Sequence, residues 1–155
     1  MHLHGKIYFA AVFLAGIAVM SFEILGSRVL VPEFGGSIEV WGALISVFLA
    51  GLSAGYAAGG RLADRFPEPR MMSWLLLAPA LLMVSFPSYG TAACQGLAAL
   101  RLEAKWGALA ASMLLFFLPC VFCGAAVPFA VRMIAPDNSR IGSAAGSVYA
   151  LSSAG

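Results

Sequence analysis

A carboxylate and a guanidinium, Glu23 and Arg28, lie five residues apart in the first apolar stretch of the chain. Charge within a membrane is costly, so such groups usually face a bundle interior and find a partner. A spacing of five does not stack two side chains on one helix face, so a direct bridge requires the helix to distort or end near Gly26. Two interpretations stay open. Either Glu23 satisfies a neighbouring helix end while Arg28 reaches the interface, or Glu23 binds a proton or a cation.

The C-x-x-C spacing of Cys120 and Cys123 is a second candidate, since it is typical of redox and zinc sites. Zinc needs about four ligands, and the only histidines are the distant His2 and His4. A thiol oxidoreductase normally needs a second cysteine pair, but Cys94 is alone, so this is the weakest function considered. We interpret the cysteines as small buried hydrophobes. No phosphate loop or Ser/His/Asp set occurs in a suitable context, so the sequence predicts no catalytic, cofactor-binding or metal-binding residue.

Long apolar stretches hold these residues and must form the elements that position them. The 155 residues are 61% hydrophobic and 10% charged, with a mean hydropathy of +0.92, whereas soluble domains carry about 25% charged residues. Four stretches exceed the roughly 20 residues that a helix needs to cross about 30 Å of hydrocarbon, and they lack the alternation of barrel strands. The sequence predicts one all-α domain, a polytopic transmembrane helix bundle of four full spans plus a partial fifth. The predicted spans are about 7–31, 40–63, 72–98, 106–134 and 142–155.

The first and last stretches each allow a second interpretation. The start of the chain resembles a signal peptide, but its apolar region is longer than the usual length of about 7–15 residues, which favours an uncleaved helix. The last stretch, residues 142–155, is too short to span a bilayer. We interpret it as the beginning of a fifth crossing, and we therefore expect the chain to be the front part of a longer protein.

The distribution of Lys and Arg predicts the orientation, because positive charge accumulates on the cytoplasmic side. With the N-terminus inside, six of the nine basic residues face the cytoplasm. The six are Lys6, Arg61, Arg65, Arg70, Arg132 and Arg140, against Arg28, Arg101 and Lys105 outside. We expect a multi-pass protein of the inner (plasma) membrane, in contact with the lipid bilayer, with a cytoplasmic N-terminus. The net charge of +2 gives no support to nucleic-acid binding.

Proline and glycine mark the turns that we expect between spans. The expected turns hold Pro32, Gly35 and Gly36; then Pro67 and Pro69; then Pro136, Asp137 and Asn138. Four more prolines lie within apolar stretches, where they predict kinks or helix ends. These are Pro79, Pro87, Pro119 and Pro128.

Small residues recur every four positions in two stretches. The first set is Gly51, Gly55 and Gly59; the second is Gly142, Gly146, Ala150 and Ala154. Such stripes let helix backbones approach closely in lipid, where packing drives association. We expect close packing within one bundle, with a homodimer seam or a sliding transporter interface as the alternative.

Three parts of the chain share residues with a known family. The first holds Glu23 and Arg28, then residues 31–37 and Val40-Trp41; the second runs from Leu49 through Gly55-Tyr56 to Gly59 and residues 60–65. The third is the C-terminal segment from Gly146 to Gly155. Together they resemble the membrane-embedded N-terminal half of fused MFS/spermidine synthase-like proteins. The resemblance implies a fold like part of an MFS half.

Residues 60–70 also resemble the loop between the second and third helices of the major facilitator superfamily. Gly60, Leu62, Ala63, Asp64 and Arg65 match that motif, and together with Arg61 they form the loop that the basic residues place on the cytoplasmic side. Pro67 stands where that motif has glycine, and Arg70 is displaced by one position. The resemblance implies an ion pair between Asp64 and an arginine of a neighbouring helix end.

The family resemblance implies a module that anchors or positions an aminopropyltransferase-like domain. That domain would use decarboxylated S-adenosylmethionine and a polyamine, but none of its catalytic residues can be placed in this chain. The alternative function is half of an MFS-like transporter for a small cation or polyamine. The expected partners are further transmembrane helices or a spermidine synthase-like domain, and the stripes also allow a homo-oligomer.

Overall fold

The computed structural model describes residues 2–135 and 141–155, with side chains from residue 5 onward in those ranges. Five helices make up this described part: α1 (His2–Phe34), α2 (Ile38–Arg65), α3 (Pro69–Ala98), α4 (Ala104–Ile134) and α5 (Ile141–Ala154). The first four have 28 to 33 residues. At 1.5 Å per residue they are about 42–50 Å long, which exceeds the hydrocarbon thickness of a bilayer.

The four long helices are apolar as well as long. Within the described residues, each contains a window of mean hydropathy between 1.6 and 2.3. Helices satisfy their own backbone hydrogen bonds, as a lipid environment demands. The prediction of an all-α membrane bundle is therefore confirmed.

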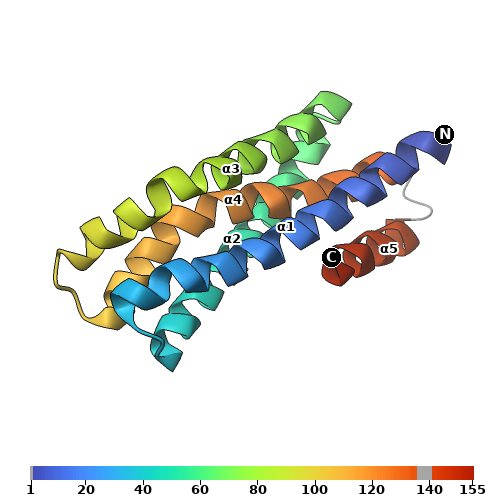
Figure 1. Cartoon of the computed structure of the whole chain (residues 1–155). Helices are drawn as coiled ribbons and strands as arrows, with labels where there is room; N and C mark the ends of the chain where they lie inside the picture. Colours follow the sequence, from blue (N-terminus) through green and yellow to red (C-terminus); the bar gives the residue numbers. More distant parts are fainter. Residues whose placement is uncertain (1, 136–140) are drawn as a thin grey trace.

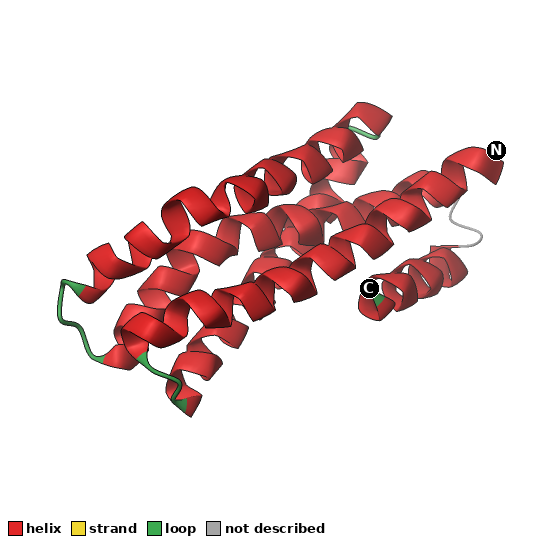
Figure 2. Cartoon of the chain, in the orientation of Figure 1, coloured by secondary structure: helices red, strands yellow, loops and turns green. Residues whose placement is uncertain are grey.

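Consecutive long helices run in opposite directions and lie side by side (Figure 1). α1 and α3 begin where α2 and α4 end, and we call this the Asp64 end because Asp64 lies in the last turn of α2. The helix α5 returns from the Asp64 end and packs along the first half of α1, in the same direction (Figures 1 and 2). At its far end, Gly155 lies against the backbone of Phe13 and Ile17. The groups that α5 adds to the bundle therefore lie in the half nearer the Asp64 end.

The first two turns differ from the sequence prediction by a few residues. The helix α1 continues through Pro32 to Phe34, so the expected end of the span at Pro32 is wrong. The chain turns at Gly35, one of the expected turn residues, where a φ of 85° favours glycine. Ser37 then caps α2 by accepting a hydrogen bond of 3.4 Å from the Val40 N–H. Pro69 is the first residue of α3, where the missing N–H of proline costs no helical hydrogen bond.

The remaining prolines lie inside helices. Pro79 and Pro87 are within α3, and Pro119 and Pro128 are within α4, so of the two expected alternatives, a kink or a helix end, the helix end is excluded. Neighbouring helices let membrane spans tolerate such breaks in their hydrogen-bond ladder. The expected turn at Pro136, Asp137 and Asn138 lies outside the described residues.

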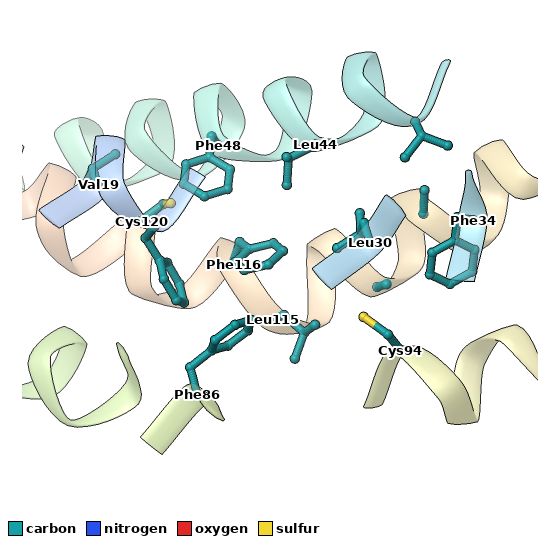
Figure 3. Packing of buried hydrophobic residues seen from close by; sticks show 14 of the residues in the cluster. Val19, Leu30, Phe34, Leu44, Phe48, Phe86, Cys94, Leu115, Phe116 and Cys120 are labelled. Atoms are coloured by element: carbon teal, nitrogen blue, oxygen red, sulfur yellow. The ribbon is translucent and has the colours of Figure 1, made fainter. Parts of the chain in front are cut away.

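The helix α4 is the centre of the bundle. In its most apolar window 67% of residues are buried, against 22–33% for the other three long helices. Phe116 of α4 is fully buried, and its ring lies 5.1 Å from Phe22, 5.4 Å from Phe48 and 5.5 Å from Phe86. Figure 3 shows Phe116 beside Phe48 and Phe86 in this cluster. One ring thus connects all four long helices.

Candidate functional site

The glycine stripe of α2 lies against α4. A Cβ on Gly51 would lie 2.7 Å from Cys120 Cβ, and one on Gly55 would lie 2.9 Å from the backbone nitrogen of Ala125. A Cβ on Gly59 would collide with the backbone of Ala125. Because these positions have no side chain, the two helices touch backbone to backbone. The stripe therefore lies at a contact inside this chain.

The small residues of α5 have different surroundings. No described atom lies within 4 Å of the Cβ positions of Gly142 and Gly146, and Ala150 and Ala154 are exposed. The helix instead packs through its buried residues Ala144 and Val148. Its contact with α1 uses Gly16, whose Cβ position is filled by the backbone of Ser152. The stripe of α5 thus faces away from the described bundle.

Glu23 and Arg28 lie on a continuous helix, because α1 passes through Gly26 without a break. Arg28 is exposed, Glu23 is partly buried, and the described residues contain no ion pair between them. Glu23 follows Val19 by four residues and Met20 by three, which puts it on the same helix face. Both of those residues line a cavity inside the bundle.

At the Asp64 end, Asp64 of α2 meets Arg132 of α4. Arg132 Nε lies 3.9 Å from Asp64 Oδ1, and the two side chains are 38% and 79% exposed. The pair therefore joins the ends of two neighbouring helices at a solvated surface, where its contribution to stability is about 0–1 kcal/mol. The two arginines of residues 60–65, Arg61 and Arg65, are exposed. The Arg65 guanidinium lies 5.5 Å from the Phe66 ring centre.

Two cavities lie between α2, α4 and α5. The first, which we call the entrance cavity, has a volume of about 300 Å³ and is lined by Gly60, Asp64, Arg132, Ile141 and Tyr149 among others. The second, which we call the polar cavity, has a volume of about 140 Å³ and also touches α1. Tyr56, Cys123, Ser152 and Ser153 supply its polar groups, and the rest of its lining is apolar or glycine: Ala15, Gly16, Val19, Met20, Leu52 and Val127. Tyr56 of the polar cavity and Tyr149 of the entrance cavity make an edge-to-face pair with ring centres 5.8 Å apart.

The three cysteines are free and buried. Among the described residues, no three His, Cys, Asp or Glu side chains are placed to hold a metal ion. Cys123 lines the polar cavity and also a separate apolar cavity of about 470 Å³ between α1 and α3. Cys120, three residues earlier, lines neither of these cavities and packs against Gly51.

Sequence reasoning did not find the Tyr56–Tyr149 pair, the role of Gly16 or the hydroxyls of Ser152 and Ser153. Tyrosines near the ends of membrane spans are also typical of an interfacial aromatic belt, so their positions in the sequence do not predict a contact. Their real contact joins α2 to α5 across more than 90 positions of sequence. No local pattern reports such a contact.

The fold defines a multi-pass helical membrane protein, and the two cavities between α2, α4 and α5 bring together the Asp64–Arg132 pair, Tyr56, Ser152 and Ser153. Comparison with protein-family models, with curated proteins and with solved structures finds no significant match to this chain.

Proposed function

We propose that this chain is the membrane-embedded module of a spermidine synthase-like protein, anchoring or positioning a synthase-like domain that lies outside these 155 residues. The supporting observation is where the residues shared with that family lie. Gly55 and Gly59 form the contact between α2 and α4, and Asp64 pairs with Arg132 at the end of the same two helices. In this proposal the module lies in the inner membrane, and its Asp64 end and N-terminus face the cytoplasm, as the basic residues indicate.

A fractionation experiment tests the anchoring role. In cells that carry the native gene, we expect aminopropyl transfer from decarboxylated S-adenosylmethionine to putrescine to be found in the membrane fraction. Removing residues 1–155 should move that activity to the soluble fraction, because the anchor is lost. Re-expressing the intact gene should return it to the membrane. Absence of the activity from both fractions, or membrane activity that persists after the deletion, contradicts the proposal.

Half of a transporter for a small cation or polyamine is the second candidate, and Glu23 favours it. This carboxylate lies on the α1 face that lines the polar cavity, and within the described residues it forms no ion pair. An acidic side chain within a membrane bundle is a functional site by default.

Flux through liposomes separates the two candidates. With the full-length protein reconstituted, we expect uptake of radiolabelled putrescine or of alkali cations, and Glu23→Gln should reduce uptake to the rate of empty liposomes because the carboxylate is lost. Glu39→Gln, which removes an exposed carboxylate at the start of α2, should leave the flux unchanged. Undetectable flux in all three proteins favours the anchor alone.

A further inference from the structure

We infer that the entrance cavity and the polar cavity form an aqueous path by which a small cation reaches Glu23 from the Asp64 end, and that the Tyr56–Tyr149 pair closes this path. The inference deepens the transporter candidate under "Proposed function".

The path begins at a charged, solvated mouth. Asp64 and Arg132 both line the entrance cavity, and both side chains are substantially exposed. Because they are 3.9 Å apart, their opposite charges largely offset each other at the mouth. The lining of the mouth therefore holds one acidic and one basic side chain that are paired with each other.

The polar cavity offers groups that a cation or water can bind. Ser152 and Ser153 bring hydroxyls from α5, Tyr56 brings a phenol from α2, and Cys123 brings a thiol from α4. Hydroxyl oxygens accept hydrogen bonds and can replace part of the hydration shell of a cation. The apolar cavity between α1 and α3 is lined by residues such as Leu14, Leu76 and Met83, so it is suited to lipid and not to water.

The two tyrosine rings touch each other, and each belongs to the lining of a different cavity. Tyr149 lines the entrance cavity, Tyr56 lines the polar cavity, and their rings pack edge to face at 5.8 Å. Each ring comes from a different helix, so a small movement of α5 relative to α2 separates them. Separation of the rings would join the two cavities.

Glu23 is at the far end of this path. Val19 and Met20 line the polar cavity, and Glu23 is on the same face one turn further along α1. The Glu23 side chain is partly buried and lies beyond the residues that line the polar cavity. A cation that passes the tyrosine pair therefore meets hydroxyls first and then a carboxylate.

Labelling of cysteines by a charged, membrane-impermeant methanethiosulfonate reagent tests the path. Three single-cysteine proteins are compared, with the thiol at Cys123, at Cys120 or introduced by Glu23→Cys, and the other native cysteines replaced by Ala. The reagent is added to inside-out vesicles and to intact cells, and monodisperse gel filtration establishes that each variant is folded. We expect labelling of Cys123 and of the Glu23→Cys thiol in inside-out vesicles, with Cys120 unlabelled. Tyr149→Ala should speed both reactions about two- to tenfold, since an aromatic pair is lost.

The outcomes separate this inference from the functions proposed above, because labelling requires no transport. If both reporters are labelled in intact cells and not in inside-out vesicles, the path exists but the Asp64 end faces the outside of the cell. If Tyr149→Ala does not speed the labelling, the tyrosine pair does not close the path. If the charged reagent fails to label either reporter from both sides, with and without Tyr149→Ala, while an uncharged lipophilic maleimide labels Cys123, the path does not exist.

Discussion

Adding one methyl group at Gly59 is expected to separate α2 from α4 and destabilise the whole bundle. The Cβ of Gly59→Ala would lie 2.5 Å from the Ala125 Cα, and backbone cannot move aside as a flexible side chain would. Overpacking of this kind costs about 1–3 kcal/mol, and a second methyl in Gly55→Ala should bring the double variant to about 3 kcal/mol or more. The two sites share Ala125, so their effects should not add independently. The unfolding free energy in mixed micelles, titrated with SDS and followed by circular dichroism, measures the loss.

Gly42 provides the matched control on the same helix. No described atom lies within 4 Å of its Cβ position. Gly42→Ala should leave the unfolding free energy unchanged or raise it by up to about 1 kcal/mol, because alanine is the better helix former. If Gly42→Ala lowers the unfolding free energy as much as Gly59→Ala does, the α2–α4 contact is not the reason why α2 needs glycine at position 59.

Truncation of Phe116 is expected to be the most damaging change to an apolar side chain. Phe116→Ala removes a fully buried ring that contacts Phe22, Phe48 and Phe86, and so it leaves a cavity where four helices meet. Phe→Ala substitutions in cores cost about 3–5 kcal/mol. We expect about 3 kcal/mol here, because lipid supplies little hydrophobic driving force and the loss is mainly one of packing. The same SDS titration measures it.

Leu114 is the control for position on α4. Its side chain is 66% exposed, so Leu114→Ala removes a group that faces lipid and not a packed contact between helices. The unfolding free energy should change by less than about 0.5 kcal/mol, as for substitutions away from packed contacts. A loss for Leu114→Ala as large as that for Phe116→Ala would mean that the aromatic cluster does not hold the bundle together.

The packing of α4 also positions the candidate site. The helix carries Cys123 of the polar cavity and Arg132 of the entrance cavity, and it is held by the glycine contact with α2 on one side. Backbone contact fixes the separation of α2 and α4, whereas the backbone contacts of α5 are with α1, at Gly16 and Gly155. Movement that opens the tyrosine pair is therefore expected in α5 and not in α2.

The number and type of the spans followed from the sequence alone. Helix length and hydropathy are local properties, and a bilayer accepts only segments that satisfy their own backbone groups. The predicted stretch 106–134 accordingly became α4 (Ala104–Ile134) with a difference of two residues at its start. The prolines were harder to interpret, since a proline that ends a soluble helix is tolerated when neighbouring membrane helices support it. The resemblance to spermidine synthase-like proteins stays a prediction.

Tertiary structure alone decided which residues meet. Asp64 was expected to pair with an arginine, but only the crossing of α2 and α4 selects Arg132. The stripes at Gly51 and Gly142 have the same spacing, yet one is filled by α4 and the other faces no described neighbour. Tyr56 and Tyr149 likewise became a pair because α5 folds back beside α1 and α4, which brings the Tyr149 ring to the Tyr56 ring of α2. Hydropathy is a property of one segment and can be summed from its sequence. Each of these contacts depends instead on the rotation and depth of two helices relative to each other, and the close packing of the whole bundle determines both.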